Sequence, residues 1–320
     1  MSNHDNPAVN ITVILCTYNR CASLTKALES IMASNMPKAA EWHVLVVDNN
    51  SKDETRDVVE QFCRRYPGRL LYLFEPHPGK SFALTSGIRE ATGDVLVFVD
   101  DDVVVQPDWL QNLTAPLHDS RWAGSGGRIL PQWSCRPPRW IPLDERGGLA
   151  PLVMFDLGAE PKELDEPPFG TNMAFRKAIV EKYGGFRLDL GPCPGSEIRG
   201  EDTDFGRRVL EGGEHLWYEP TALVHHAVAP NRLQQRYFLR WWFDKGRSDF
   251  REFGVDKDAR LTIAGVPLYM LRRIAHWGVR WAIALKPSKR FSCKMKLWAL
   301  VGRMVESHRQ VASRGIDGRA

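Results

Sequence analysis

Strand-like and helix-like hydrophobic patterns alternate through the first hundred residues, and this alternation constrains the fold more than any other feature of the sequence. Residues 11–16 are apolar and rich in β-branched side chains, whereas the apolar side chains of residues 21–34 recur at helical spacing. Further strands are predicted at 42–47, 70–74 and 94–99, and further helices over the segment that carries Val58, Val59 and Phe62 and at about 81–91. The α/β alternation favours a parallel, doubly wound sheet with right-handed crossovers, which binds ligands beyond the carboxyl ends of its strands.

Polar side chains follow the predicted strands at that edge: Thr17, Tyr18, Asn19, Asp48, Asn49, Glu75, Asp100, Asp101 and Asp102. The three adjacent aspartates would repel one another unless a cation sat among them. Mg²⁺ or Mn²⁺ prefers such oxygen ligands and would also hold substrate phosphates. The alternative is an acidic loop that caps the helix beginning near Pro107.

Asp48 ends the second predicted strand and is followed by a polar turn. Asn50, Ser51 and Asp53 are typical of a turn that bonds its own backbone and caps the next helix. Asp48 lies at the same predicted edge as the three aspartates, so we expect it to contact a ligand, such as a base or a ribose hydroxyl.

Residues 124–189 are rich in Pro, Gly and Trp, which is typical of irregular loops. A helix is predicted at about 201–211, and its first turn holds Glu201, Asp202 and Asp204. Capping and the helix dipole account for one such acid, but three exceed that need.

A strand predicted near residues 215–224 ends in His225 and His226. Adjacent strand residues point to opposite faces, so at least one imidazole is expected to face a polar site, where it is available to a metal. Burial of both in the core is the alternative.

Charge is distributed unevenly along the chain. Residues 1–235 hold 24 Lys and Arg against 32 Asp and Glu, whereas residues 236–320 hold 19 against 7. The basic C-terminal quarter suggests an anionic partner, either membrane headgroups or nucleic acid. One helical stripe there is apolar: Val266, Met270, Ile274, Trp277, Trp281 and Leu285. Such a stripe either lies in a membrane interface or packs as ordinary core.

Several classes of protein are disfavoured by what the sequence lacks. Its longest apolar stretches are strand-sized and its N-terminus has no basic patch before an apolar run, so we expect no transmembrane helix, no secretory signal and a cytoplasmic location. The six cysteines form no Cys-x-x-Cys pair. The dinucleotide fingerprint, the phosphate loop, the serine nucleophile elbow and the His-Glu-x-x-His pair are all absent.

An ordered set of short motifs resembles the family 2 glycosyltransferases, which have the GT-A fold, over roughly residues 9–250. The motifs are Thr17-Tyr18-Asn19-Arg20, Val47-Asp48-Asn49-Asn50-Ser51, Gly79-Lys80-Ser81, Asp100-Asp101-Asp102, Gly170-Thr171-Asn172-Met173-Ala174-Phe175-Arg176 and Gly200-Glu201-Asp202. Within the family, the chain looks most like bacterial exopolysaccharide transferases. It departs from the family pattern at Cys16, where proline is common, and at Thr85-Ser86-Gly87, where Asn-x-Gly is common.

The resemblance implies a GT-A domain at 9–254, with a nucleotide-sugar half at 9–123, an acceptor half at 124–254 and a basic helical region at 255–320. It implies a metal-dependent, inverting transfer of a sugar from a nucleoside-diphosphate sugar to a hydroxyl of a saccharide or polyprenyl-linked acceptor, with Mn²⁺ or Mg²⁺ as cofactor.

The resemblance also assigns residues. Donor nucleotide contacts fall on Thr17, Tyr18, Asn19, Asp48, Lys80 and Asp100. The metal falls to Asp102 and Asp100, completed by His225 or His226, while Asp202 is the catalytic base and Glu201 and Asn172 contact the acceptor. The expected location is cytoplasmic, peripheral on the inner face of the cell membrane.

Two other functions are left open by the residues alone. A nucleotidyltransferase also combines a parallel sheet with acidic metal ligands, but it would release pyrophosphate. A nucleic-acid-binding protein would use the basic C-terminal quarter and its tryptophans, with binding to single strands that depends steeply on salt. The motif set favours the transferase, with no nucleic acid as partner.

Overall fold

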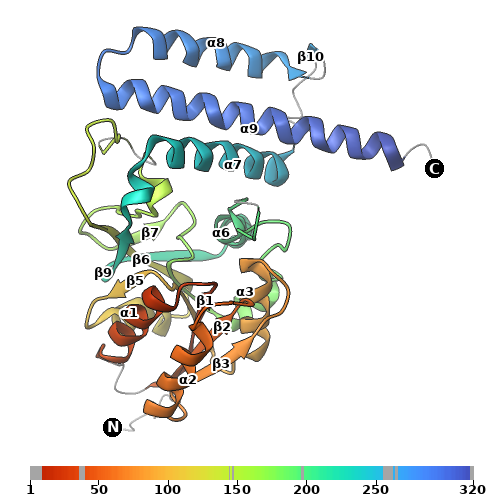
Figure 1. Ribbon diagram of the computed structural model, residues 1–320. Coiled ribbons are helices and arrows are strands. Elements are labelled where there is room, and N and C mark those ends of the chain that lie inside the picture. The colour runs from red at the N-terminus through yellow and green to blue at the C-terminus, as the bar shows by residue number, and fades with distance from the viewer. Residues whose placement is uncertain are drawn as a thin grey trace. The chain divides into compact units, whose positions relative to one another are not determined.

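The computed structural model describes residues 9–35, 40–143, 145, 148–195, 198–254, 262–263 and 266–317 (Figure 1). The chain forms two compact units. The sheet unit comprises Met1–Gln132, Val153–Pro194 and Glu201–Ala227, and the helical unit comprises Trp133–Leu152, Gly195–Gly200 and Val228–Ala320.

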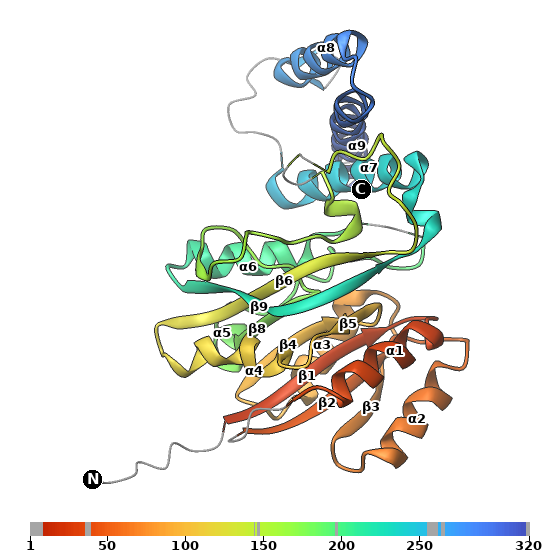
Figure 2. The ribbon, with the colours of Figure 1, turned by 90° about the vertical axis from the view of Figure 1, so that its left-hand side faces the viewer.

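Four parallel strands form the first half of the nine-stranded sheet, in the order β3-β2-β1-β4. They are β1 (Val9–Thr17), β2 (Ala40–Asp48), β3 (Leu70–Phe74) and β4 (Val95–Asp100). The connecting helices are α1 (Cys21–Met32), α2 (Thr55–Arg65) and α3 (Lys80–Glu90). The chain reverses its direction across the sheet after β3, so right-handed crossovers put α1 and α2 on one face and α3 on the other (Figure 2). The predicted strand and helix alternation is confirmed here.

The chain after β4 extends this sheet with antiparallel strands. They are β5 (Val103–Val105), β6 (Trp122–Trp133), β7 (Lys162–Leu164), β8 (Asn172–Arg176) and β9 (His215–Val228). β8 pairs antiparallel with β4 and carries the order on to β6, β9 and β5, while β7 pairs with β9. The sheet is therefore mixed, and its parallel part is the half that the alternation predicted.

The prediction of irregular structure over residues 124–189 is wrong for most of β6 and for β8. A Cβ at Gly124 would collide with the Phe175 ring, and a Cβ at Gly127 with the Asn172 side chain. The glycines that resemble turn signals are the residues that let β6 approach β8, because glycine in a strand permits close contact with a neighbour.

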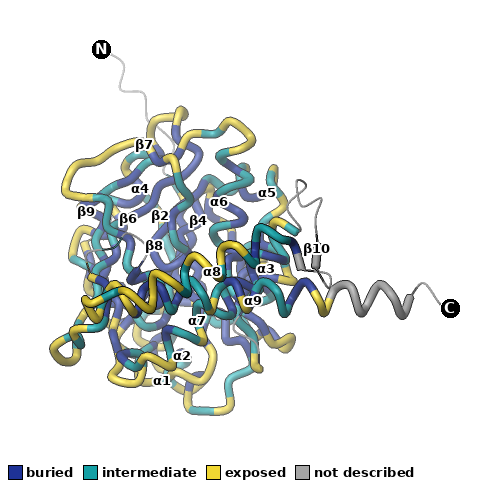
Figure 3. The backbone as a smooth tube through the Cα atoms, turned by 90° about the horizontal axis from the view of Figure 1, so that it is seen from above, coloured by how far each residue is buried: buried dark blue, intermediate teal, exposed yellow. Residues whose placement is uncertain are grey.

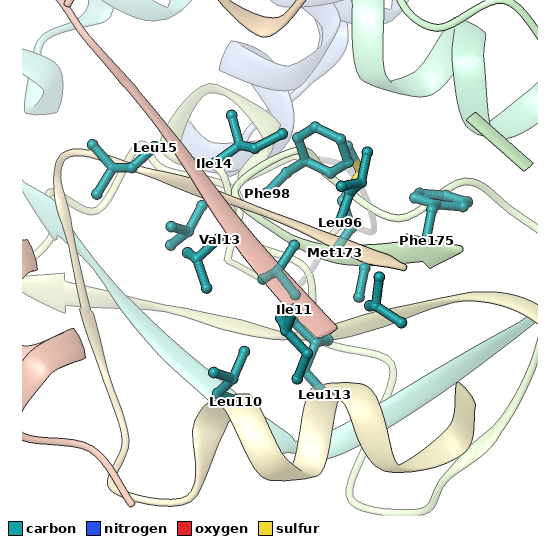
Figure 4. Packing of buried hydrophobic residues seen from close by; sticks show 14 of the residues in the cluster. Ile11, Val13, Ile14, Leu15, Leu96, Phe98, Leu110, Leu113, Met173 and Phe175 are labelled. Carbon is teal, nitrogen blue, oxygen red and sulfur yellow. The ribbon is translucent and has the colours of Figure 1, made fainter. Parts of the chain in front are cut away.

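Strands β1 and β4 form the centre of the core and are buried on both faces, as parallel strands usually are. Adjacent residues Val13 and Ile14, which point to opposite faces, are both fully buried. Leu110 and Leu113 of α4 (Trp109–Thr114) cover one face (Figure 4). Each such side chain stabilises the fold by about 1.5–3 kcal/mol. The remaining helices of the sheet unit are α5 (Lys177–Lys182), α6 (Glu201–Glu211) and the 3₁₀ turn Ala115–His118.

The helical unit is built on three long helices: α7 (Gln235–Phe253), α8 (Leu268–Ile283) and α9 (Pro287–Asp317). Its shorter elements are the strands β10 (Thr262–Ile263) and β11 (Val266–Pro267) and 3₁₀ turns at Ala150–Leu152 and Pro230–Leu233. α9 lies beside both α7 and α8 (Figure 1).

Small residues set the distance between α7 and α9. A Cβ at Gly246 would collide with the carbonyl oxygen of Ala299, and one at Gly302 with that of Phe243. The two backbones therefore touch at these positions. Among the helices of the described residues, none combines the length and the apolar content needed to cross a bilayer.

Candidate active site

The parallel strands end in register at one edge of the sheet unit. Thr17 at the end of β1 pairs with Asp48 at the end of β2, and on the other side Cys16 pairs with Asp100 at the end of β4. Three of the predicted donor-site residues are thus brought to neighbouring strand ends, because parallel strands present their carboxyl ends at the same edge.

Lys80 joins this edge to the start of α6. Its Nζ donates a 2.7 Å hydrogen bond to Asp100 Oδ1 and lies 3.8 Å from Glu201 Oε1. Burial acts to lower the pKa of Lys80, but the charges of Asp100, Glu201 and Asp202 raise it above its ordinary value. Lys80 is therefore held as a cation among residues far apart in the sequence.

Asp100 is fixed by two donors. Besides Lys80, the Thr171 hydroxyl donates to its Oδ2 at 2.6 Å. Burial acts to raise the pKa of Asp100, but the Lys80 ammonium and these hydrogen bonds hold it below the ordinary value. Asp100 is therefore a carboxylate at neutral pH.

Arg20 bridges the other two aspartates of the triplet. Its Nη1 donates to Asp101 Oδ1 at 3.0 Å and to Asp102 Oδ2 at 2.8 Å, and the Thr17 hydroxyl donates to Asp101 Oδ2 at 2.8 Å. Burial, and after it the charge of Asp102, raises the pKa of Asp101 above its ordinary value despite Arg20. The carboxylates of the triplet therefore still oppose one another when Arg20 is in place.

The two adjacent histidines lie within β9 and differ in surroundings. His226 is buried, and its Nε2 lies 3.3 Å from Asp102 Oδ1. The ring of His225 is partly buried, with Nδ1 3.3 Å from the Gln106 amide nitrogen. Of the two predicted alternatives, His226 is the imidazole beside the aspartates.

The donor set of Asp102 and His226 fits a divalent cation. A carboxylate oxygen and an imidazole nitrogen suit Mn²⁺, and a carboxylate suits Mg²⁺. Within the described ranges, no three His, Cys, Asp or Glu side chains form a group that could hold a metal ion. Mg²⁺ sites of phosphate-handling enzymes commonly use one or two protein ligands and complete the shell with water and substrate phosphate. The residues present match that kind of site.

Asp48 is buried at the end of β2, with both of its oxygens engaged. The Ser51 backbone N–H donates to Oδ1 and the Tyr72 hydroxyl to Oδ2, each at 2.9 Å. Burial and this bond to Asp48 raise the pKa of Tyr72. The bond from Ser51 is a contact within the polar turn that follows β2, so Asp48 both shapes this turn and lies at the site edge.

Tyr18 and Asn19 follow β1 at the surface. The Tyr18 side chain is exposed, and Asn19 adopts a left-handed backbone with φ 51°. The Asn19 amide oxygen accepts from the Lys52 N–H at 2.6 Å, and its own N–H donates to the Ser51 hydroxyl at 2.9 Å. These bonds tie the turn after β1 to the turn after β2.

Asp202 lies in the first turn of α6. Its Oδ2 accepts from the Gly170 N–H and its Oδ1 from the Thr203 N–H, both at 2.7 Å. The preceding Glu201 is buried, whereas Asp202 is partly exposed. Asp202 thus has a fixed orientation and retains access to solvent.

Asn172, which we expected at the acceptor, lies inside the sheet unit and is fully buried. Its amide oxygen accepts from the Trp109 indole at 2.8 Å, and its amide nitrogen donates to the carbonyls of Arg128 and Ala222 at 3.1 and 2.7 Å. The amide is used to join β8 to its neighbours.

Three residues contact the site aspartates without having been predicted from the sequence: Arg20 binds Asp101 and Asp102, Thr171 binds Asp100, and Tyr72 binds Asp48. Arg20 and Thr171 belong to the quoted motifs and could have been found there. Tyr72 is one of several apolar or aromatic residues of β3, and only the pairing of β2 with β3 brings it to Asp48.

The mixed sheet with its carboxylate-lined edge is the fold of the GT-A type, similar to that of solved glycosyltransferases. The chain belongs to glycosyl transferase family 2, because its residues 12–184 match the sequence pattern of that family. The predicted fold class and enzyme class are thereby confirmed.

Relatives of the chain are glycosyltransferases or act in polysaccharide synthesis. The succinoglycan biosynthesis protein ExoM of Rhizobium meliloti is 29% identical over 247 residues, covering 77% of this chain and 76% of its own. The glucosyl-dolichyl phosphate glucuronosyltransferase of Haloferax volcanii is 26% identical over 252 residues, covering 75% and 76%. The mannosyltransferase PcManGT of Pyrobaculum calidifontis, solved in complex with GDP-Man and Mn²⁺, matches with a TM-score of 0.57 at 18% identity, covering 98% of this chain and 82% of its own.

Proposed function

We propose that this family 2 glycosyltransferase transfers a sugar from a nucleoside-diphosphate sugar to an acceptor hydroxyl, with inversion at the anomeric carbon and with a divalent metal. The observation that carries the proposal is the position of Lys80, bonded to Asp100 at 2.7 Å and 3.8 Å from Glu201. Lys80 links the end of β4, which is suited to a nucleotide bound with a divalent metal, to α6, the helix that carries the candidate base Asp202. We assign the transfer reaction to residues 9–254.

The donor nucleotide is proposed to lie over the ends of β1, β2 and β4. Asp48 would accept a hydrogen bond from the base or ribose, and the Lys80 ammonium would face the diphosphate. The other proposed donor contacts are Thr17, Tyr18, Asn19 and Asp100. The complex of PcManGT with GDP-Man supports a nucleotide-sugar donor.

Asp102 and His226 are the proposed protein ligands of the metal, with Asp100 beside them. Bound there, Mn²⁺ or Mg²⁺ would act as a Lewis acid that stabilises the negative charge developing on the departing diphosphate. Arg20 already neutralises part of the charge of Asp102 and would keep this carboxylate oriented toward the site.

Asp202 is the proposed general base. Because two backbone amides hold its carboxylate in a fixed orientation, it can accept the proton of the attacking hydroxyl. Attack on the face opposite the leaving diphosphate then inverts the anomeric centre. Glu201 is proposed to position the acceptor through its link to Lys80, and for Asn172 we propose an internal structural role in place of acceptor contact.

The acceptor is proposed to be a saccharide, free or polyprenyl-linked, in the synthesis of a bacterial polysaccharide. ExoM, a succinoglycan biosynthesis protein, and a transferase named for a dolichyl phosphate substrate support this class of acceptor. A lipid-linked acceptor suggests a peripheral location on the inner face of the cell membrane.

A donor screen tests the proposal. Purified protein is incubated with nucleoside-diphosphate sugars, with and without lipid-linked saccharides, and the released nucleotide is identified. We expect a nucleoside diphosphate, formed only with Mn²⁺ or Mg²⁺ and lost with a chelator. Release of pyrophosphate would indicate a nucleotidyltransferase instead, and full transfer in excess chelator would contradict the metal.

A further inference from the structure

The end of α8 and the turn that follows it expose large aliphatic side chains. Val279, Ile283 and Leu285 are 61%, 70% and 97% exposed. Val279 and Ile283 are four residues apart, so they lie on one face of the helix. Much of α8 is drawn as exposed in Figure 3. Aliphatic side chains gathered at an exposed turn commonly mark an interaction site.

The apolar stripe that the sequence predicted from Val266 to Leu285 differs from the exposed surface of Val279, Ile283 and Leu285. Met270 is buried, the Trp277 ring lies 4.3 Å from the Lys296 ammonium of α9, and the Trp281 ring lies 4.9 Å from the Arg290 guanidinium. Over most of its described length the stripe packs toward α9, although Trp281 keeps 38% of its surface exposed and Leu285 at its end is almost fully exposed. The Val266 side chain lies outside the described residues.

Along the chain, the segment that carries the exposed aliphatic residues has charge of one sign, and Glu145 reaches α9 from another segment, 3.9 Å from Lys296 Nζ. No Asp or Glu occurs between Asp258 and Glu306, whereas this stretch holds ten Lys and Arg. Four of these cations flank the turn and are exposed: Arg280, Lys286, Lys289 and Arg290. An apolar tip whose own segment carries several cations and no acid is complementary to a surface that is apolar beneath and anionic outside.

A phospholipid bilayer fits this surface better than a nucleic acid does. Single strands bind where bases stack on aromatic rings. The outermost side chains here, Ile283 and Leu285, have no π face, and the Trp277 and Trp281 rings already have a cation over them. Aliphatic side chains of this kind are suited to insertion between lipid headgroups.

We propose that residues 279–290, the docking tip, bind the surface of an anionic phospholipid bilayer. Val279, Ile283 and Leu285 enter the headgroup layer, while Lys286 and Lys289 extend to the phosphates. Arg280 and Arg290, which lie over the Trp277 and Trp281 rings, add positive charge beside them. α8 lies in the interface. This inference rests on the proposed peripheral location and not on the proposed chemistry.

Sedimentation of the full chain with phosphatidylcholine vesicles, with and without phosphatidylglycerol, tests the docking tip. We expect the protein to pellet with the anionic vesicles at low salt and to stay in the supernatant with the neutral ones. Leu285→Ser should weaken binding by about tenfold or more, from the lost burial of an aliphatic side chain. Replacing one flanking cation, as in Lys286→Gln, should weaken it about fivefold.

Matched controls lie elsewhere in the helical unit. Val301→Ser removes an exposed apolar side chain of α9, and Arg240→Gln removes an exposed cation of α7. Both should bind anionic vesicles as the wild type does. The tip residues are exposed, so their variants should keep the wild-type Tm.

Three results would overturn the proposal: no pelleting of the wild type, equal pelleting with neutral vesicles, or unchanged binding by the tip variants. So would tip-dependent binding of a single-stranded oligonucleotide without vesicle binding. Transfer to a soluble acceptor, measured in parallel, should be the same in wild type and tip variants. If transfer is absent while vesicle binding persists, the proposed function fails and the docking tip stands.

Discussion

Each unit of the molecule has an ionic cluster, and the two clusters are built in opposite ways. In the sheet unit, three consecutive aspartates share Arg20 and Lys80 as cationic partners. In the helical unit, buried Glu306 is held by Arg247 at 2.9 Å and Arg251 at 2.6 Å.

The pKa directions show the difference. Burial raises the pKa of Asp101 above its ordinary value despite Arg20, whereas Arg251 and Arg247 outweigh the burial of Glu306 and lower its pKa. A further cation beside the first cluster would lower the pKa of Asp101, whereas the carboxylate of the second cluster is already held ionised by its own arginines. Carboxylates and cations thus form the candidate active site in the sheet unit. In the helical unit they form a structural clamp, in which Glu306 of α9 binds Arg247 and Arg251 of α7.

The largest effect is expected at the candidate base, next to the first cluster. Asp202→Asn should lower kcat by about 100-fold or more, because an amide cannot take the proton of the acceptor hydroxyl. Donor binding should stay near the wild-type value, since the amide oxygen still accepts one backbone hydrogen bond. Turnover and donor affinity are measured by nucleotide release and calorimetry. Glu211→Gln, exposed at the end of α6, is the control, and an Asp202→Asn enzyme with more than a tenth of wild-type turnover would reduce Asp202 to a helix cap.

The adjacent histidines offer a matched pair for the metal. His226→Gln should weaken Mn²⁺-dependent donor binding by about tenfold or more, a loss typical of changes at or beside a metal ligand. His225→Gln should leave it unchanged, because His225 lies on the other face of β9. Calorimetry with the donor, in the presence and absence of Mn²⁺, measures both, and equal behaviour of the two variants would remove His226 from the proposed site.

In the second cluster, Glu306→Gln should destabilise the fold by about 2 kcal/mol at neutral pH, because charged hydrogen bonds from two arginines are lost. The control is Asp249→Asn, which breaks a more exposed pair with Lys245. Thermal unfolding measures both.

This loss should depend on pH in a defined direction. The folded pKa of Glu306 is lowered from 4.5, so its stabilisation is complete above that pH and fades as the pH falls through the folded value. The Tm difference between wild type and Glu306→Gln should therefore be constant from neutral pH to about pH 5 and shrink in more acidic buffer. A difference that grows on acidification would contradict the clamp.

The smallest effect is expected at Arg20, whose side chain is 44% exposed. Arg20→Gln should cost no more than about 1 kcal/mol, because solvent screens its ion pairs. Excess Mn²⁺ should raise the Tm of this variant more than that of the wild type, since the aspartates then lack one of their own cations. Arg56→Gln, which breaks a surface pair on α2, should respond to Mn²⁺ as the wild type does. Equal Tm shifts in all three proteins would contradict the expectation that a further cation stabilises the aspartates of the first cluster.

The sequence by itself determined the parallel half of the sheet and the polar residues at its edge. Hydrophobic periodicity is a local property, so β1, β3, α3 and α6 could be placed to within one or two residues. The order of the motifs was sufficient for the family, because most of them follow a recognisable strand or open a helix, although the motif at residues 170–176 fell in a stretch predicted to be irregular.

Only the tertiary structure decided how distant residues pair. That β6 is a strand depends on the space that Phe175 and Asn172 occupy beside its glycines, and the choice of His226 over His225 depends on the register of β9. Arg20 meets Asp101 across 81 positions of sequence, and the face of α8 that stays exposed is selected by its packing on α9. Local patterns encode the elements, whereas strand register and helix packing are set by contacts between residues far apart in the chain, and a local pattern does not contain those contacts.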